Sequence, residues 1–314
     1  MVNLALLGCG GGMPIPERYL SSLLIKYKGR KILIDCGEGT QVSMKILGCG
    51  FKSIDVICIT HGHGDHIIGL PGILATIGNS GRTEPITIIG PKGITDIVAG
   101  LRVVAPYLPY EINIVENPQE PLKMKASINS INASVEKFND IIISTLELEH
   151  STNCLGYSFH FGRKPKFDIE SATTNEIPKI FWSRLQKGEI IIDQGKTYLP
   201  STVLGEERIG IKVSFITDTR PFPKIATFIK GSDLFICEGT YGNQNDIEKA
   251  VKNKHMTFSE AAELALNGEV QELLLTHFSP SMLNPEEYKD RAEEIFKNSF
   301  IGFDRYVKTI SFKN

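Results

Sequence analysis

One short segment constrains this chain more than any other. An apolar run, DVICIT at residues 55–60, leads directly into His-Gly-His-Gly-Asp-His at residues 61–66. In an extended exit from a strand, alternate residues project the same way, so His61 and His63 should face one metal ion. The two glycines permit positive φ, and we expect them to swing the following aspartate and histidine toward a second metal position. The candidate ligands in this segment are His61, His63, Asp65 and His66.

Three distant strand-like runs also end in side chains that bind metals. His150 follows IIISTLELE, Asp218 follows IKVSFIT, and His277 follows ELLLT. A single histidine at a strand end is more often a hydrogen-bonded polar group than a ligand. Here, however, the three residues would complete the coordination of two ions, because a carboxylate can bridge two cations. The sequence therefore predicts a dinuclear metal centre.

The remaining pattern is that of an α/β protein. Strand-like runs such as NLALLG and KILIDCG occupy the first half, and the second half adds the helical segments PFPKIATFIKG and TFSEAAELALNG. A hydrophobic content of 41% in 314 residues supplies a substantial core. The pattern weakens over about 163–207, which holds the only tryptophan, Trp182. We expect a single domain over 1–314 with an inserted arm or loop at about 163–207, whose apolar residues could dock on the body or on a partner subunit.

Composition limits where the chain works and what it binds. No apolar run approaches the ~18 residues of a membrane helix, and the first residues lack the pattern of a signal peptide. We therefore expect a cytoplasmic protein with no membrane partner. The six cysteines form no Cys-x-x-Cys pair, which favours reduced thiols in the core. A net charge of −2 means that nucleic-acid binding would need a local basic patch.

Together with the ligand motif, several further blocks resemble the ribonuclease Z-like branch of the metallo-β-lactamase fold superfamily. These blocks are DCGEGTQ, GLPG, HSTNCLGYSF, ITDTRP and LLTHFSP, and the likeness covers nearly the whole chain. The resemblance implies an α/β fold of αββα type, with two mixed sheets packed face to face in a four-layer sandwich and helices outside. It also implies a homodimer.

The resemblance further implies a distribution of ligands between two divalent metal ions. One ion would be held by His61, His63 and His150, the other by Asp65, His66 and His277, and Asp218 would bridge them. Zinc is the usual occupant, and Mn²⁺ or Fe²⁺ suit the same ligands.

The activity implied is that of an endoribonuclease removing the 3′ trailer of precursor tRNA. Two bound cations make hydroxide available at neutral pH for in-line attack on phosphorus, and Asp65 can accept the proton of the attacking water. Glu238 and His255 would form the general acid for the leaving oxygen. The alternative for His255 is a histidine at a helix start without a chemical role. Arg18 lies in a substrate-contacting loop of the family, where it is either a phosphate contact or an ordinary surface charge.

The chain departs from the family's pattern at substrate-binding positions. Residues 14–19 read PIPERY where the common bacterial type has Pro-x-Lys-x-Arg-Asn, and Ser281 and Met282 replace an Arg-Tyr pair. A diverged paralogue that hydrolyses a cyclic nucleotide or another RNA is therefore an alternative hypothesis. A non-catalytic scaffold is a third, but it should have lost ligands or the general acid, and this chain keeps both.

Overall fold

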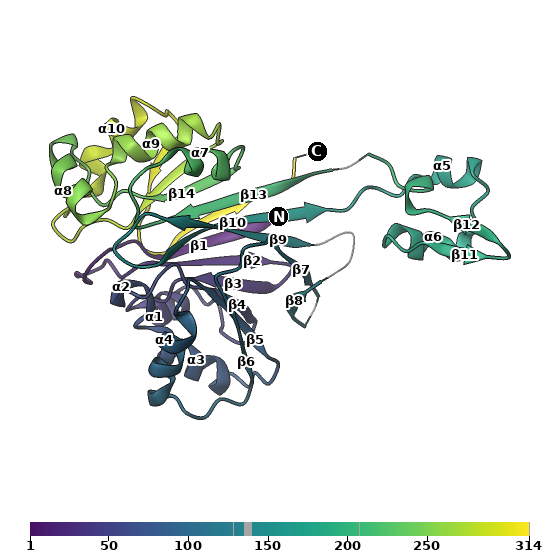
Figure 1. Ribbon diagram of the computed structural model, residues 1–314, viewed down its shortest axis with the longest axis horizontal. Helices are drawn as coiled ribbons and strands as arrows, with labels where there is room; N and C mark the ends of the chain where they lie inside the picture. Colours follow the sequence, from purple (N-terminus) through teal and green to yellow (C-terminus); the bar gives the residue numbers. More distant parts are fainter. Residues whose placement is uncertain (128, 135–139, 207, 314) are drawn as a thin grey trace.

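Two large β-sheets lie face to face in the computed structural model of the chain, with helices outside each sheet (Figure 1). The structure describes residues 1–127, 129–134, 140–206 and 208–313. Helices α1 to α4 lie on the outer side of one sheet and helices α7 to α10 on the outer side of the other (Figure 1). This arrangement confirms the predicted αββα sandwich.

The first sheet has seven strands in the order β17-β1-β2-β3-β4-β5-β6. It is mixed, because the pairs from β17 to β3 are antiparallel and those from β3 to β6 are parallel. Its strands are β1 (Val2–Gly8), β2 (Ser22–Tyr27), β3 (Arg30–Ile34), β4 (Ile54–Cys58), β5 (Ile86–Gly90), β6 (Ile112–Glu116) and β17 (Tyr306–Ile310). Its helices are α1 (Thr40–Ile46), α2 (Gly64–Ile67), α3 (Leu70–Asn79) and α4 (Ile94–Leu101).

The second sheet has eight strands in the order β16-β15-β14-β13-β10-β9-β7-β8. Strands β13 to β16 are parallel, and the remaining pairs are antiparallel. The strands are β7 (Leu122–Ala126), β8 (Ile131–Ala133), β9 (Ile141–Leu148), β10 (Cys154–Arg163), β13 (Arg208–Ile216), β14 (Leu234–Glu238), β15 (Leu273–Thr276) and β16 (Ser299–Ile301). The helices are α7 (Pro223–Ile229), α8 (Ile247–Asn253), α9 (Phe258–Asn267) and α10 (Lys289–Glu293).

Strands β1 to β5 of the first sheet are largely apolar on both faces because both faces are covered. In β1, Leu4 and Leu6 point into the core between the two sheets, whereas Ala5 and Leu7 belong to the core under the helices. A strand covered on both faces reads as a continuous apolar run rather than as an alternating one. The runs predicted as strands in the first half, such as NLALLG, are strands of this kind, which confirms that interpretation.

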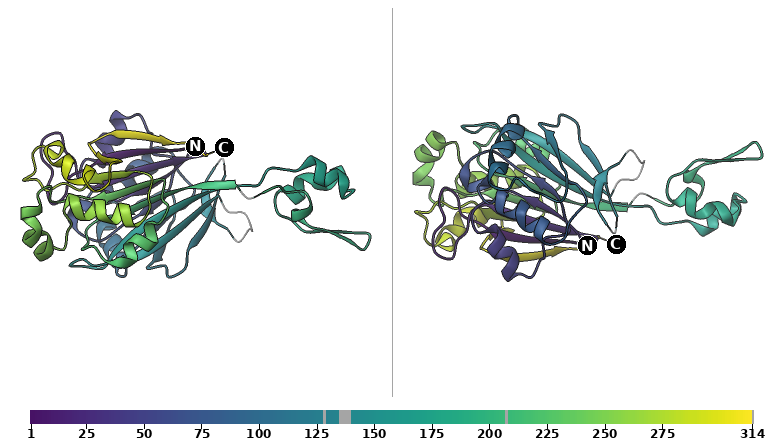
Figure 2. Two further views of the ribbon diagram at one scale, coloured as in Figure 1. Left: turned by 90° about the horizontal axis from the view of Figure 1, so that it is seen from above. Right: turned by 90° about the horizontal axis from the view of Figure 1, so that it is seen from below.

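The residues between Arg163 and Arg208 leave the body and fold by themselves at the end of two long strands (Figure 2). They form α5 (Ile169–Thr174), α6 (Lys179–Gln186) and a hairpin of β11 (Ile191–Asp193) with β12 (Lys196–Tyr198). The segment has its own apolar core, which includes Leu185. Trp182 packs there against Phe167, with ring centroids 4.9 Å apart, and so contributes to the segment's own core rather than docking on the body.

Two other expectations can be compared with the structure directly. All six cysteines are free and buried, as expected for structural thiols. Within the described residues, no helix is both long enough and apolar enough to cross a membrane.

Candidate metal centre

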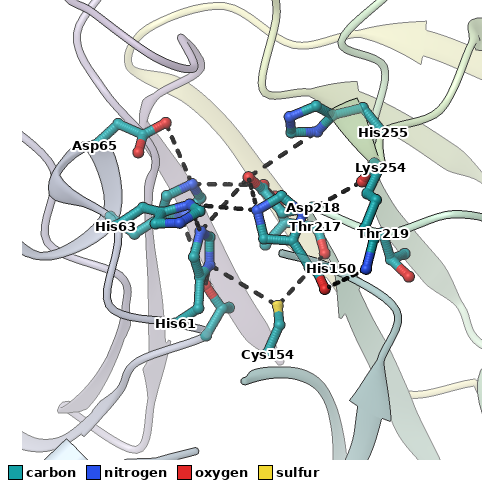
Figure 3. A network of polar contacts seen from close by, with 12 residues as sticks. His61, His63, Asp65, His150, Cys154, Thr217, Asp218, Thr219, Lys254 and His255 are labelled. Atoms are coloured by element: carbon teal, nitrogen blue, oxygen red, sulfur yellow. Dashed lines mark hydrogen bonds and ion pairs between the residues drawn. The ribbon is translucent and has the colours of Figure 1, made fainter. Parts of the chain in front are cut away.

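The predicted ligands converge at one edge of the sandwich, between the two sheets (Figure 3). The segment 61–66 follows β4, and its last residues form the short helix α2. His150 follows β9, Asp218 follows β13 and His277 follows β15. Since β9 and β13 are both antiparallel to β10, they run in the same direction and end at the same edge. The topology thus explains why distant segments meet here.

One group consists of His61, His63, His150 and Asp218. The Nδ1 atom of His63 lies 3.1 Å from Nε2 of His61 and 3.3 Å from Nε2 of His150. One carboxylate oxygen of Asp218, Oδ2, lies 3.6 Å from Nε2 of His61 and 3.7 Å from Nε2 of His150. Four ligand atoms therefore surround one point.

A second group consists of Asp65, His66 and His277. The two Nε2 atoms of His66 and His277 lie 3.1 Å apart, and Oδ2 of Asp65 is 3.5 Å from the first and 3.4 Å from the second. The other oxygen of Asp218, Oδ1, lies 3.4 Å from His66 Nε2 and 3.2 Å from His277 Nε2. Asp218 therefore presents one oxygen to each group.

These spacings fit metal coordination. Two ligands bound tetrahedrally to zinc at about 2.0–2.1 Å lie about 3.3–3.4 Å from each other. The measured separations between ligand atoms bracket that value in both groups. The facing atoms are imidazole nitrogens and carboxylate oxygens, a mixed ligand set that suits zinc, iron and manganese. The two groups can therefore hold two divalent ions that share Asp218.

The backbone is unusual at two of these residues. Asp218 has φ 43° and His277 has φ 58°, both in the left-handed region that residues other than glycine rarely adopt. Such conformations persist where the surroundings enforce them, and they gather at functional sites. By contrast, the expected positive φ at Gly62 and Gly64 is wrong, since neither residue has it. The turn of α2, which begins at Gly64, redirects the chain instead.

The sequence interpretation missed the groups that orient the ligands. The buried Asp35 carboxylate lies 2.7 Å from Nδ1 of His66 and accepts hydrogen bonds from Thr60. The hydroxyl of Thr240 lies 3.1 Å from Nδ1 of His277. Partners of this kind fix the ring orientation and tautomer of a ligating histidine. Asp35 belongs to the DCGEGTQ block and Thr240 to CEGT, but neither lies in a ligand-like pattern.

The predicted acid pair is adjacent to the ligands. Nδ1 of His255 lies 3.1 Å from Oε2 of the fully buried Glu238, and 4.0 Å from Oδ2 of Asp218. Burial opposes the charged imidazole, but the Glu238 carboxylate outweighs it and raises the pKa of His255 to about 9. Figure 3 shows His255 beside Asp218 on the side opposite His61. The imidazole is thus positioned and charged as a proton donor would be.

Arg18 does not line the cleft at the metal ligands. Its guanidinium donates to the backbone carbonyls of Met282 (2.7 Å) and Leu283 (2.8 Å), and it lies 5.9 Å from the ring centroid of Phe278. The side chain therefore connects its own loop to the segment after His277. A contact between Arg18 and a substrate phosphate would have to compete with these bonds.

A cleft of about 500 Å³ opens on the ligands. The glycine run at the start of the chain forms one wall, where the Gly12 amide donates to Oδ2 of Asp65 at 2.6 Å. At Gly11 a Cβ atom would come within 2.4 Å of the His277 ring, so glycine is required there. Tyr241 and Lys252 also line the cleft. The cleft thus gives a substrate access to five of the ligands and to the proposed acid, which are His63, Asp65, His150, Asp218, His277 and His255.

Comparison with known proteins gives one family model and several full-length relatives. Residues 2–197 match the family model described as anti-Pycsar protein Apyc1. Full-length relatives are named ribonuclease Z: the protein from Clostridium beijerinckii is 61% identical, with 99% of each chain covered. The ribonuclease Z of Clostridium tetani is 57% identical, with 100% of each covered.

Solved structures agree on the fold. Human tRNase Z, short form, superposes with a TM-score of 0.67 at 22% identity, covering 99% of this chain and 100% of that one. The metallo-β-lactamase fold protein YhfI from Bacillus subtilis gives 0.67 at 18% identity, covering 98% and 100%. Because these two relatives match the chain from end to end at more than half identity and are both named ribonuclease Z, the chain belongs to the ribonuclease Z family, on the metallo-β-lactamase fold.

Proposed function

We propose that this protein is a metal-dependent endoribonuclease that removes the 3′ trailer of precursor tRNA. The observation that carries the proposal is the pair of ligand groups sharing Asp218, next to a cleft that His255 also lines, with the buried Glu238 behind its imidazole. A metal centre next to a charged imidazole suits hydrolysis of a phosphodiester. Kinship with full-length proteins named ribonuclease Z points to precursor tRNA as the substrate.

The ligand residues would hold two divalent ions, with zinc the first choice and Mn²⁺ or Fe²⁺ compatible with the same atoms. When bound, such ions lower the pKa of water and neutralise charge on phosphorus. The ligands in this proposal are His61, His63, Asp65, His66, His150, Asp218 and His277.

Residues of this chain would accept and donate the protons of the proposed reaction. The Asp65 carboxylate, whose Oδ2 is fixed by the Gly12 amide, borders the cleft and can accept a proton from the attacking water. On the opposite wall, His255 can donate a proton to the leaving oxygen, and Glu238 keeps the imidazole oriented and charged. Asp65 and His255 are thus the proposed catalytic base and acid.

The arm, residues 163–207, would grip the body of the tRNA at a distance from the metal centre. It projects from the sandwich and is not needed to complete the core, since its apolar side chains pack on each other (Figure 2). We also propose that two copies of the chain form a homodimer, so that two arms and two metal centres are available to one substrate.

The test is cleavage of a precursor tRNA carrying a 3′ trailer by the purified protein supplied with Zn²⁺ or Mn²⁺. The Asp65→Ala variant and a chromogenic phosphodiester serve as comparisons. We expect one cut at the trailer junction, absent in the variant. Hydrolysis of the chromogenic diester without cleavage of the tRNA would contradict the substrate while leaving the metal centre intact. Failure on both substrates, with two metals bound, would contradict the hydrolase itself.

A further inference from the structure

A second hollow opens at the opposite edge of the first sheet, where β3 and β4 begin. It has a volume of about 690 Å³, within the range of small-molecule sites. Four basic residues line it, Arg30, Lys31, Lys45 and Lys52. Strand β4 runs from this hollow toward the metal centre, and at ~3.3 Å per residue its length keeps the two sites apart. The hollow is thus separate from the proposed active site.

Lys31 is the unusual residue of this hollow. The residue as a whole is 8% exposed, and its ammonium donates a hydrogen bond to the hydroxyl of Ser53. Across the described residues, no carboxylate lies within 4.0 Å of the ammonium of Lys31, Lys45 or Lys52. Burial, with the nearby Lys26, lowers the pKa of Lys31. A buried ammonium with one hydroxyl partner is costly unless an anion joins it.

The buried carboxylate of Asp55, behind the hollow, already has hydrogen-bond partners on both oxygens. Asp55 binds the guanidinium of Arg30 through two nitrogens and that of Arg82 through a third, and it also accepts a bond from the amide of Ile131. Arg30 and Arg82 are themselves buried. A half-exposed acid at the rim, Glu84, lies 3.6 Å from Arg82. Positive charge therefore exceeds negative charge in and behind the hollow.

We propose that this hollow binds a small phosphate-bearing molecule, such as inorganic phosphate or a mononucleotide. The phosphate would lie between Lys31 and Lys52, where it would supply the anion that the buried ammonium lacks. The hydroxyl of Ser53 offers a further hydrogen bond, and the half-buried Phe51 ring supplies an apolar wall for the rest of the molecule. This site does not depend on the proposed catalytic function.

The hollow can be monitored separately from the metal centre. Protein with bound metal, labelled with ¹³C at the methionine methyl groups, is titrated with phosphate, with AMP, and with a short RNA lacking terminal phosphates. Met44 lines the hollow, whereas Met256 neighbours His255 at the metal centre. The methyl signal of Met44 therefore reports binding at the new site, and that of Met256 reports binding to the metal ions.

We expect phosphate and AMP to shift the Met44 signal saturably. Lys31→Gln should weaken that binding by about tenfold, since it removes the buried charge. Should this variant fold poorly, Lys52→Gln at the same hollow should still weaken binding severalfold. Lys230→Gln is the control for net charge, because Lys230 is an exposed residue paired with Glu269 in the other half of the sandwich.

Three results would overturn the proposal. The Met44 signal would stay unmoved by phosphate and AMP while that of Met256 shifts, or the lysine variants at the hollow would bind as tightly as the Lys230 control. In the third result, only the RNA would shift the methyl signal of Met44. The hollow would then be a surface for a nucleic-acid backbone.

Discussion

His66 is held from both sides of its ring. Its Nε2 faces the second ligand group, while Nδ1 lies against the buried Asp35 carboxylate, which two bonds from the Thr60 hydroxyl and one from its amide hold in place. Asp35 itself has a left-handed backbone, φ 57°, which indicates that its position is enforced. The site therefore extends one layer beyond the residues that would touch a metal.

The Asp35→Asn variant tests that outer layer. The amide keeps the size of the side chain but removes the charge behind His66, so metal affinity should fall by about 10–100-fold. Metal content after equilibration with a graded series of chelator concentrations measures the change, and Asp168→Asn in the arm is a matched control. Equal retention of metal by the two variants would mean that Asp35 serves only the fold.

His255→Ala tests the general acid. His255 could form a third group with Asp218 and His277, but the two groups proposed as metal sites are complete without it. Its loss should therefore slow cleavage by about 10²–10⁴-fold with both metals still bound. Single-turnover cleavage, together with elemental analysis of the same sample, separates these effects. Full activity in the variant would refute the assignment, and loss of metal would make His255 a ligand.

Among single residues, the sequence predicted the candidate ligands that directly follow strands. A histidine or aspartate directly after an apolar run is visible because the run defines the strand and the strand defines the edge. Asp35 and Thr240 have no such mark, since their role depends on distances to histidines elsewhere in the chain. For Arg18 the sequence could not show that backbone carbonyls near Met282 engage the guanidinium.

Among the elements, the arm is the most independent. An isolated β-bridge between Phe167 and Leu204 joins the two ends of the arm. Leu185 is fully buried inside the arm. None of these three residues contributes to the cores of the sandwich. Sequence patterning located this segment only by the weakening of strand signals, because helices of six and eight residues carry little periodicity.

Replacing residues 168–203 by a short Gly-Ser linker tests the arm. We expect unchanged hydrolysis of a chromogenic phosphodiester, since the metal centre lies in the sandwich, and a fall of at least about 100-fold in kcat/KM for precursor tRNA. Parallel kinetics on the two substrates give the comparison. Equal losses on both would show instead that the arm supports the fold, and no loss on either would remove it from RNA binding.

Predictability also varied among the elements of the body. Helix α9 was predicted over its length, and the reason is local: Thr257 and Glu260 form a capping box that fixes its start. Strands β6 to β8 had no clear signal, because their residues are mostly half-exposed or exposed and because β6 and β8 are edge strands. Local chemistry is readable in one sequence, whereas edge strands depend on partners far along the chain.

For the whole molecule, the proposed homodimer needs an apolar surface. Val103, Val104 and Tyr107 follow α4 and are 76%, 76% and 95% exposed. Exposed apolar side chains this close together are typical of an interaction surface. We expect a mass in solution of twice the 34.7 kDa of one chain.

The Val103→Asp, Tyr107→Asp double variant should shift the chain to the monomer without loss of secondary structure, because neither side chain supports the core. Light scattering after size-exclusion chromatography measures the mass, and circular dichroism checks the fold. A variant that stays dimeric would place the interface elsewhere, and a monomeric unmodified protein would remove the dimer from the proposal.

The two ends of the chain meet in the first sheet, where β1 pairs with β17 from Val2↔Ile310 to Leu6↔Tyr306. A ribosome adds about 5–20 residues per second, so the first strand waits about 15–60 s for its last neighbour. During that time one edge of β1 offers unpaired backbone groups to any other nascent strand. A chain truncated before residue 306 would keep that edge open permanently, and we expect it to aggregate or to be degraded even though every proposed metal ligand is present.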